Sequence, residues 1–539
     1  MFDHSHADSD HKRTSENFTT DDMPVLKIGF EEERDLIEFK SSGRFTVLNN
    51  QGMPILKDVT SPMKWRVKVE QKQPARYSFG VLVGKFDDKS QAQELEYQLI
   101  EKGIGTRIKT RGGKLYCNEA VVNDNTQYWV TVDNYATEQK AVRFAREMLS
   151  GFDYQIITEK VNQPHAVLEL FDSEFEKLGE AENVIRIVPE ADDVTTYIYD
   201  VIPENEVQTL PVRQRMFRRT LEFRASADGK LTIICEIPLE KYVESIVAFE
   251  MKSDYPEELI KAQAIAVRSK TLASLGIKHY DDPFHLCAGP HCQTFNGLTR
   301  TSEAIEKAVK ATAGIVLKDN KKVVDAHYTL ICGGHTESSH CLYSIENEEQ
   351  YPPVFDGREP RQLEQIGDLS VNENLRQWAS SEPDVFCNVT NYGNHIALNY
   401  LKKYFHWQVT YERRELEEIV SAKIGENIGD IFDIIPIRRG VSGRILELEI
   451  LGSNRNLILK TEWEIRHTLA ADLLFSSCFV INRQFDEDGF PLAFSFLGVG
   501  HGHGVGLCQA GGIVMALKKA SYNDILNHYF RNTKPYKIY

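Results

Sequence analysis

The sequence predicts an α+β protein in which a main domain carries an inserted ferredoxin-like α+β module. Three observations lead to this fold class. Alternating apolar and polar residues over 445–451 and 456–460 indicate half-buried strands. Apolar residues at helical spacing indicate two adjacent helices within 238–275. Two successive strand–helix units between 77 and 149 have the order of a βαβ-βαβ module.

The N-terminal segment, residues 1–23, is low in apolar content, and we expect it to be disordered. It is polar and lacks the apolar stretch of a signal peptide. Residues 24–66 contain short strands, including 25–30 and 45–48. We expect these to be the leading strands of the main domain.

The inserted module is expected over residues 74–158. A strand over 77–86 precedes an amphipathic helix over 90–102, which ends at Gly103. A second strand–helix unit follows over 128–149. The alternative is an α+β insert that binds no ligand.

The rest of the main domain is expected over residues 161–539, with strands near 195–236 ahead of its helices. The first helix carries Glu250 four residues after Ile246, on the same apolar stripe. A carboxyl group held among apolar groups has a raised pKa, so it can stay protonated and donate a proton. A Glu- and Pro-rich stretch over 338–393 is expected to be an excursion around the site.

The second helix starts at Pro256 and repeats this pattern. Gln263 shares a face with Leu259 and Val267. Two neighbouring helices that each place a polar group on an apolar face indicate a site. The alternative is that Glu250 and Gln263 lie at helix margins in water, as Glu and Gln usually do.

A series of segments, in order along the chain, resembles the stage II sporulation protein D (SpoIID) family. These segments are PLEKYV (238–243), AFEM (248–251), KAQAIAVR (261–268), HCQ (291–293), GGHTE (333–337), RRGVSGR (438–444), GHGVGLCQ (502–509) and the closing SYNDILNHY (521–529). The ordered series covers about 300 residues. It implies a SpoIID-type catalytic domain around the inserted module.

The resemblance implies a peptidoglycan lytic transglycosylase, which cleaves the MurNAc–GlcNAc bond and leaves 1,6-anhydro-MurNAc ends. It makes Glu250 the single acid and base. A glycoside hydrolase usually needs two carboxylates. Here the 6-hydroxyl of the sugar is the nucleophile, and proximity favours its attack over that of water. The alternative is a non-catalytic glycan-binding activator of an N-acetylmuramoyl-L-alanine amidase.

The resemblance also implies a set of substrate-binding residues around the acid. This set is Gln263, Arg268, His335, Thr336, His503 and Gln509. For the two histidines, which lie in glycine-rich turns, buried structural roles are the alternative. The chain departs from the family at Cys332 and Cys508, where serine is usual, and at His501, where an aromatic residue is usual. The sequence leaves open whether the two cysteines form a thiol pair or bind a metal.

A metal site is indicated by His279, His285, Cys287, His291 and Cys292, which lie within fourteen residues. A Cys-x4-Cys pair with nearby imidazoles can complete a tetrahedral zinc site. The resemblance assigns a structural zinc to Cys287 and Cys292, with His279 and His291 as further ligands. The alternatives are a Cys287–Cys292 disulfide or two free thiols.

Charge and hydropathy limit the possible partners. The net charge of −16 argues against nucleic-acid binding, which relies on basic surface. The chain has no 18-residue apolar run, so no transmembrane helix is expected. The module over 74–158 resembles the SPOR (sporulation-related repeat) domain, which binds peptide-stripped glycan.

The expected partners are therefore peptidoglycan glycan strands and, for the activator, a cell-wall amidase. A peptidoglycan substrate implies an extracytoplasmic location, in the periplasm or cell envelope, although no signal peptide is visible. A third interpretation, an intracellular interaction protein, rests on that missing signal alone.

Overall fold

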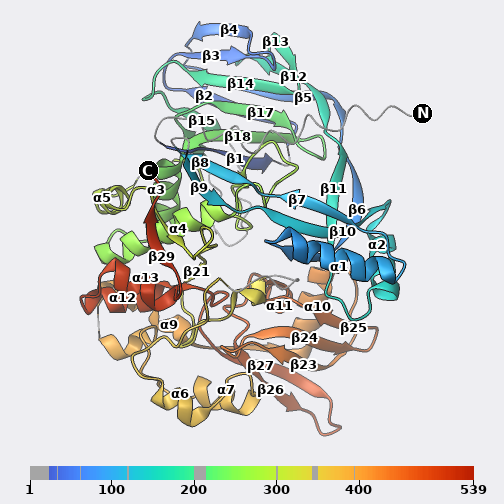
Figure 1. Ribbon diagram of the computed structural model, residues 1–539, viewed down its shortest axis with the longest axis vertical. Helices are drawn as coiled ribbons and strands as arrows, with labels where there is room; N and C mark the ends of the chain where they lie inside the picture. Colours follow the sequence, from blue (N-terminus) through green and yellow to red (C-terminus); the bar gives the residue numbers. More distant parts are fainter. Residues whose placement is uncertain are drawn as a thin grey trace.

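The computed structural model describes residues 23–539 apart from 33, 61, 118–119, 200–213, 299–300, 343–349 and 394. The segment expected to be disordered lies outside the described residues except for Met23. The fold is mixed α+β, with two large sheets at one end, a small α+β unit beside them, a helical layer in the middle and a second β-rich unit at the other end (Figure 1).

The two large sheets are built from strands on both sides of the inserted module. The seven-stranded sheet has the order β19 (Leu286–Cys287), β1 (Val25–Glu32), β18 (Leu231–Pro238), β17 (Leu221–Ala225), β14 (Val184–Pro189), β3 (Phe45–Leu48) and β4 (Pro54–Val59). The six-stranded sheet has the order β13 (Lys177–Glu182), β12 (His165–Phe171), β5 (Trp65–Gln73), β2 (Leu36–Ser41), β15 (Thr196–Tyr199) and β16 (Gln214–Phe217).

Aromatic rings join the two sheets face to face. Burial alternates along β2 and β3, as expected for strands with one face in a core. Phe39 of β2 contacts Phe45 of β3 and Phe223 of β17, with ring centroids 5.9 and 5.8 Å apart. The leading strands are thus part of the same core as the strands that follow the module.

The module lies between β5 and β12, which are paired neighbours. Its sheet has the order β11 (Gln155–Asn162), β6 (Arg76–Phe86), β10 (Gln127–Tyr135) and β7 (Arg107–Arg111), with α1 (Lys89–Glu101) and α2 (Glu138–Met148) as crossovers. All neighbours are antiparallel, which is the ferredoxin-like arrangement that the sequence predicts. β11 continues past the expected boundary at 158, and a hairpin of β8 (Lys114–Cys117) and β9 (Ala120–Asp124) is added.

The module is docked firmly on the main domain. The Asn125 side chain donates to the carbonyls of Ala273 and Leu275, at 3.1 and 2.7 Å. Trp129 packs edge-on against Tyr280, with ring centroids 5.6 Å apart. The module is therefore not joined through its two connections alone.

The helical layer is centred on α4 (Glu257–Ala273), whose residues from Leu259 to Ser269 are nearly all buried. Its other members are α3 (Leu239–Glu250), α5 (Glu303–Ala311), α12 (Gln509–Leu517) and α13 (Tyr522–Tyr529), with the strand pair β20 (Ile315–Lys318) and β29 (Lys534–Lys537). Pro238 and Pro256 are the N-cap residues of α3 and α4. The helices thus begin where the two prolines predict.

The second β-rich unit has its own core. It contains β22 (His406–Glu412), α10 (Arg413–Ile424), β23 (Ile431–Arg439), β24 (Ile445–Gly452), β25 (Asn456–Leu459), α11 (Glu462–Thr468), β26 (Phe479–Phe485) and β27 (Pro491–Val499). Short elements lead to it: β21 (Tyr328–Thr329), the 3-10 turns η1 (Ser339–Leu342) and η2 (Val389–Tyr392), α6 (Arg361–Ile366), α7 (Asn372–Ala379), α8 (Ile396–Asn399) and α9 (Lys402–Phe405). β28 (Leu507–Cys508) returns the chain to the helical layer.

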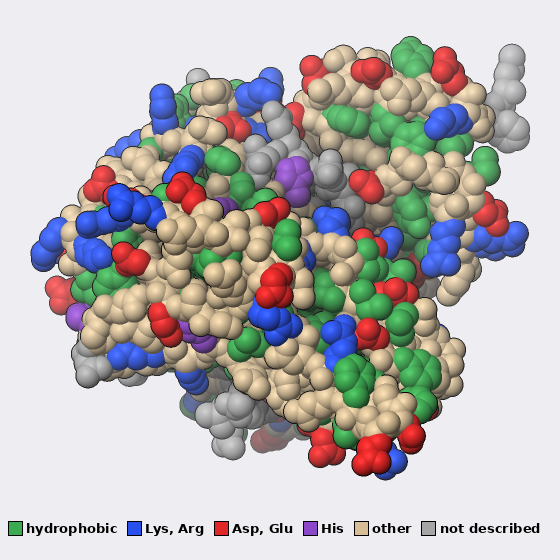
Figure 2. All heavy atoms as spheres, turned by 90° about the horizontal axis from the view of Figure 1, so that it is seen from below, with side chains coloured by type: hydrophobic (Ala, Val, Ile, Leu, Met, Phe, Trp, Pro, Cys, Tyr) green, Lys and Arg blue, Asp and Glu red, His purple; other side chains and the backbone are tan. Residues whose placement is uncertain are grey.

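Acidic and basic side chains are interspersed on the face seen from below (Figure 2). Among the described residues, no helix is both long and apolar enough to cross a membrane.

Candidate active site and metal centre

Glu250 is the last residue of α3, and its side chain is half-buried. Burial raises the pKa of its carboxyl group to about 7, and a hydrogen bond from the Gln509 side chain opposes this rise. The negative end of the helix dipole also disfavours a charge at this position. The arrangement produces an acid that holds its proton near neutral pH and can still be reached from outside. The alternative of a helix margin in water does not apply.

A short parallel pairing of β21 with β28 positions the start of α12, so that the Gln509 side chain reaches Glu250. Tyr328 pairs with Leu507 in this ladder, and Gln509 follows Cys508, which pairs with Thr329. The pKa of Tyr328 is raised well above its ordinary value by burial and by the nearby charge of Glu250. Two polar side chains from distant parts of the chain therefore surround the acid.

Tyr328 connects the acid to the loop after α4. Its hydroxyl donates to Oε1 of Gln293 at 3.2 Å. Nε2 of Gln293 donates in turn to Oγ1 of Thr271, on α4, at 2.8 Å. This chain of hydrogen bonds fixes the Tyr328 ring beside Glu250.

Three of the glycine-containing motifs meet at Arg444, which is fully buried. Its guanidinium donates to the carbonyls of Cys332 and Gly502, at 2.9 and 3.1 Å. A side chain at Gly504 would collide with this guanidinium, and Gly504 also has a φ of +80°. These contacts explain why the turn after Gly502 needs glycine.

Glu337 of the GGHTE segment caps the RRGVSGR turn (438–444). Its carboxylate accepts hydrogen bonds from the backbone N–H groups of Val441 and Ser442 and from the Ser442 hydroxyl, at 2.7–3.2 Å. Glu337 is 2% exposed, and these hydrogen bonds occupy both oxygens of its carboxylate. Glu337 therefore holds the motifs together.

The histidines and threonine of the expected site support the same loops. His503 accepts the N–H of Val505 at Nδ1, 3.0 Å, and its pKa lies well below the ordinary value because it is buried. Nδ1 of His335 lies 2.7 Å from the carbonyl of Thr336. Thr336 is buried and exchanges hydrogen bonds with Val354. These contacts favour a scaffolding role for the three side chains.

Arg268 requires a correction to its expected substrate-binding role. Its side chain is fully buried and binds Glu240 of α3 through two hydrogen bonds, at 2.7 and 2.8 Å. A third N–H group donates to the carbonyl of Ile315 at 2.8 Å. The guanidinium thus fastens α3 and β20 to α4 and leaves no face for a substrate.

Gln263 is buried completely, so it is not at a helix margin in water. Neither of its amide atoms has a hydrogen-bond partner among the described residues. An unpaired buried amide costs about 1–3 kcal/mol, and such groups are rare. The fold does not use the polar atoms of Gln263.

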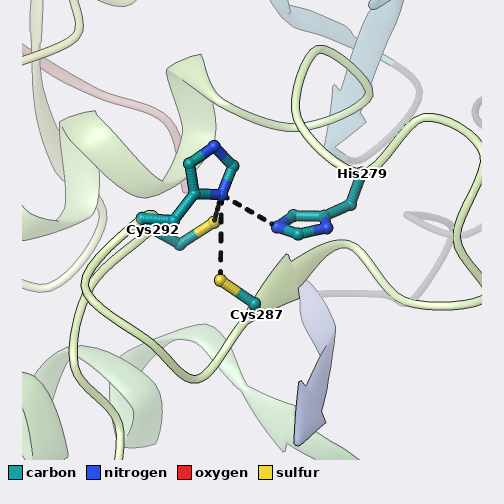
Figure 3. Close-up of side chains that lie close together, drawn as sticks. His279, Cys287 and Cys292 are labelled. Atoms are coloured by element: carbon teal, nitrogen blue, oxygen red, sulfur yellow. Dashed lines mark hydrogen bonds between the residues drawn. The ribbon is translucent and has the colours of Figure 1, made fainter. Parts of the chain in front are cut away.

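The predicted metal ligands come together in the loop between α4 and α5 (Figure 3). Nδ1 of His291 lies 3.2 Å from Nε2 of His279, 3.9 Å from Sγ of Cys287 and 3.8 Å from Sγ of Cys292. β19 pairs with β1 and so places Cys287 at the sheet edge. Cys287 and Cys292 carry separate thiols rather than a disulfide.

This donor set fits a tetrahedral zinc ion. Ligand bonds of about 2.0–2.3 Å imply ligand–ligand separations of roughly 3.3–3.8 Å, close to those found. Nδ1 of His279 is held by the Asp282 carboxylate at 2.8 Å, which leaves Nε2 directed at the other ligands. The four residues could therefore hold a metal ion.

A cleft of about 1040 Å³ lies where the module meets the end of α4. Lysines 85, 89, 278, 321 and 322, together with Asp87, Tyr128, His327 and Tyr351, are among its lining residues. The ring of His327 packs edge-on against His503, with centroids 5.8 Å apart. Glu250 does not line this cleft.

Sequence reasoning missed Tyr328, Gln293 as a positioning residue, and the hub formed by Glu337 and Arg444. Gln293 and Arg444 lie within segments that resemble the family, so their motifs were a usable signal. Tyr328 lies outside these segments, and its contact with Glu250 depends on strand pairing alone.

Comparisons with known proteins match two parts of the chain to family models. Residues 227–318 match the stage II sporulation protein (SpoIID) family, and residues 349–506 match a domain of unknown function (DUF8618). The first of these contains α3, α4 and the metal ligands. The second contains the second β-rich unit.

Two curated relatives align with more than half of the chain. An uncharacterized protein of Brachyspira hyodysenteriae (strain ATCC 49526 / WA1) is 24% identical over 302 residues, which cover 56% of this chain and 67% of the relative. The amidase enhancer of Bacillus subtilis (strain 168) is 22% identical over 307 residues, 54% of this chain and 40% of the enhancer. The chain thus spans less than half of the enhancer.

A crystal structure of a protein of Burkholderia pseudomallei K96243, described as exported, aligns with 40% of this chain and 44% of its own. The identity is 13% and the TM-score 0.16, so this likeness carries no argument.

Proposed function

We propose that the chain, whose residues 227–318 match the SpoIID family, is a peptidoglycan lytic transglycosylase with Glu250 as its single acid and base. The observation that carries this proposal is the pKa of Glu250, raised to about 7 by burial at the end of α3. A carboxyl group with this pKa is present in both protonation states near neutral pH, as one residue that donates and then accepts a proton requires.

The reaction needs no second carboxylate. Protonated Glu250 donates its proton to the glycosidic oxygen between MurNAc and GlcNAc, and the bond from C1 of MurNAc to that oxygen breaks. The 6-hydroxyl oxygen of the same MurNAc then bonds to C1, and the Glu250 carboxylate takes the hydroxyl proton. The products are a 1,6-anhydro-MurNAc end and a free GlcNAc hydroxyl. No water is consumed, and Glu250 regains its proton.

Gln509 and Tyr328 are assigned positioning roles in this mechanism. The Gln509 amide hydrogen-bonds the Glu250 carboxyl group and so fixes its orientation. Tyr328 stands beside the acid and is held by Gln293. Gln293 directly follows Cys292, so a zinc ion at His279, Cys287, His291 and Cys292 would act structurally, by fixing this loop. Zinc would supply no step of the proton transfer.

Peptidoglycan glycan strands are the proposed substrate, and the proposed location is therefore extracytoplasmic. For the module at 76–162, we retain glycan binding as a proposal that rests on the SPOR resemblance. The ferredoxin-like strand order is compatible with it.

The second candidate function is activation of a cell-wall amidase without cleavage of glycan. The similarity to the Bacillus subtilis amidase enhancer favours it. An activator needs glycan or amidase contacts but no acid with a raised pKa. The two functions therefore differ in their dependence on Glu250.

The deciding experiment is mass spectrometry of glycan digests, with peptidoglycan and peptide-stripped glycan as substrates. The protein should release fragments with 1,6-anhydro-MurNAc ends, and Glu250→Gln should reduce the rate by about 10²–10⁴-fold. The matched control is Glu244→Gln on the same helix, where Glu244 pairs with Lys241 and accepts a hydrogen bond from the Thr301 hydroxyl. Wild-type cutting by Glu250→Gln, or ends that lack the anhydro ring, would contradict the proposal.

A further inference from the structure

A second cluster of metal-ligand side chains lies in the interior, away from the loop after α4. Cys332, Asp356, Cys387 and Cys508 bring their ligand atoms within 4.8 Å of one another. Each residue is at most 1% exposed. They come from four separate segments of the chain, so the fold, not a local turn, assembles them.

We propose that these four side chains bind a second divalent metal ion, for which zinc is the best match. Three cysteine sulfurs and one carboxylate oxygen are donors that zinc accepts, and four ligands complete its structural coordination. The first cluster, around Cys287, shares no ligand with this one. The protein would therefore hold two metal ions per chain.

The spacing of the thiols agrees with this assignment. Sγ of Cys332 lies 3.6 Å from Sγ of Cys387. A tetrahedral zinc ion with Zn–S bonds of about 2.3 Å separates two sulfurs by roughly 3.8 Å, whereas a disulfide requires about 2.05 Å. The backbone N–H of Cys332 donates to Sγ of Cys508 at 3.3 Å, a contact that stabilises a thiolate ligand.

The carboxylate is held in the same manner. The backbone N–H of Cys387 donates to Oδ2 of Asp356 at 2.9 Å, and the hydroxyl of Tyr529 donates to Oδ1 at 2.5 Å. A side chain at Gly511 would collide with both Tyr529 and Asp356, so the start of α12 can approach only as glycine. Each oxygen keeps a lone pair for a further ligand bond.

Charge balance favours a cation at this position. A buried carboxylate is costly unless it is paired or bound to a metal. In the described part of the chain, the ion-pair contact of Asp356 is to Nε2 of His528, 4.0 Å away, which is too far for a hydrogen bond. A divalent ion would offset half of the negative charge of the carboxylate and the three cysteine thiolates, as it does in Cys₄ zinc sites.

The position of the cluster indicates what the metal does. Cys332 directly precedes the GGHTE segment, and Cys508 is the N-cap residue of α12, directly before Gln509. Asp356 and Cys387 belong to the chain that leads to the second β-rich unit. One metal ion would thus clamp that chain, the GGHTE loop and the start of α12, whose Gln509 hydrogen-bonds Glu250. With four protein ligands the site has no open position, so its role is structural.

The test is the metal content of the full-length protein, purified under reducing conditions, by inductively coupled plasma mass spectrometry. The wild type should carry two zinc ions per chain and Cys387→Ser one. The control Cys235→Ser changes a buried cysteine of β18 outside both clusters and should keep two. Equal metal content in Cys387→Ser and the wild type would overturn the proposal.

A second variant keeps the test decisive if Cys387→Ser does not fold. Cys287→Ser/Cys292→Ser disables the first cluster and leaves the second intact, so it should retain one metal ion. Replacing that ion with Co²⁺ should give the intense sulfur-to-cobalt absorption of a thiolate site. Absence of metal from this folded variant, or a Cys332–Cys387 disulfide found by peptide mapping of the reduced-purified wild type, would also overturn the proposal. None of these readouts depends on glycan cleavage.

Discussion

At the scale of single residues, the acid is defined by where its helix ends. Glu250 closes α3, so its carboxyl group faces both buried side chains and the negative end of the helix dipole. Gln509 is the neighbour that tempers this effect, because its hydrogen bond lowers the pKa that burial raises. The balance leaves the pKa of Glu250 near 7, where one carboxyl group can serve in both steps of the proposed reaction.

The pH dependence of cleavage should report this pKa. The proposed reaction starts from protonated Glu250, so kcat/KM should fall as pH rises through about 7 and approach a tenfold loss per pH unit. The measurement is the initial rate of anhydro-end formation between pH 5 and 9, with protein integrity checked at each pH. A rate that stays constant from pH 6 to 9 would show that the acid has a different pKa.

The same shift has a consequence for folding. The folded protein holds a proton on Glu250 that the unfolded chain releases above about pH 4.5. Stability from this group is therefore full below pH 4.5 and is lost as pH rises to about 7. Glu250→Gln should be less sensitive to pH over this window, as measured by denaturant unfolding of the wild type and the variant at pH 5 and pH 8.

Gln509→Ala should shift the fall of kcat/KM with rising pH to a higher pH. The substitution removes the hydrogen bond that lowers the pKa of Glu250, so the protonated form should persist to higher pH. Overall kcat should fall because the carboxyl group loses its orientation. Gln484→Ala, at an exposed position of β26, is the control and should leave the pH profile unchanged. If kcat/KM of Gln509→Ala falls at the same pH as that of the wild type, Gln509 does not influence the pKa of Glu250.

At the scale of elements, the pairing of α3 with α4 explains why the role of Arg268 was misassigned. The expected role of Arg268 came from its place in the KAQAIAVR segment, which does not show that Glu240 lies opposite. Glu240 is 28 residues earlier, on another helix, and its carboxylate accepts hydrogen bonds from the Arg268 guanidinium. A buried arginine is therefore a poor guide to a substrate site until its partner is known.

The module illustrates a second element-scale point. β5 and β12 would form a simple hairpin if the module were absent, because Gln73 pairs with His165. Residues 74–164 can therefore be replaced by an Asn-Gly turn without changing the strand register. Asn125 and Trp129 nevertheless tie the module to the main domain. Its β8–β9 hairpin also contributes Leu115, Cys117 and Val122 to the main core, so removal of the module uncovers apolar surface there and at Tyr280.

This replacement should weaken binding to polymeric peptide-stripped glycan while sparing cleavage of short soluble glycans. A second glycan-binding unit raises local concentration, which matters for a polymer and little for a fragment. Co-sedimentation measures binding to polymeric glycan, and product analysis measures cleavage of short glycans. Asn125→Ala in the full chain is the control, because it weakens the contact between the module and α4 but keeps the module. If the shortened protein sediments with glycan as fully as the intact one, the module is a structural insert.

At the scale of the whole molecule, the sequence predicted elements with strong local signals. The ferredoxin-like order, the two helices that begin after Pro238 and Pro256, and the grouping of Cys287 with Cys292 all depend on residues close together in the chain. An acid with a raised pKa at Glu250 was also predicted, because the apolar stripe of α3 is visible in the sequence.

The contacts that complete the site join residues far apart in the chain, and local patterns do not contain them. Arg444 reaches the Cys332 carbonyl across 112 residues, and Cys332 lies against Cys387 across 55. The separate core of the second β-rich unit was likewise missed, since its strands have the same alternation as those of the main domain. Tertiary pairing decides such features.

Metal removal is the prediction that tests the molecule as a whole, because each of the two proposed ions would hold a segment that positions a neighbour of Glu250. The first would fix Gln293 and so Tyr328, and the second would fix Cys508 and so Gln509. Loss of metal should therefore lower thermal stability and glycan cleavage together. A ligand that binds the folded state at 1,000 times its Kd stabilises it by about 4 kcal/mol, which makes a measurable shift in Tm.

The experiment treats the protein with a chelator under reducing conditions, verifies the metal content, and measures Tm and anhydro-end formation. Added Zn²⁺ should restore both, whereas Mg²⁺ should not, since thiolate and imidazole ligands suit zinc and not magnesium. Glu250→Gln should show the same loss and recovery of Tm with no recovery of cleavage, which separates scaffold from acid. Metal-free protein that melts and cuts like the untreated sample would mean that neither cluster supports the site.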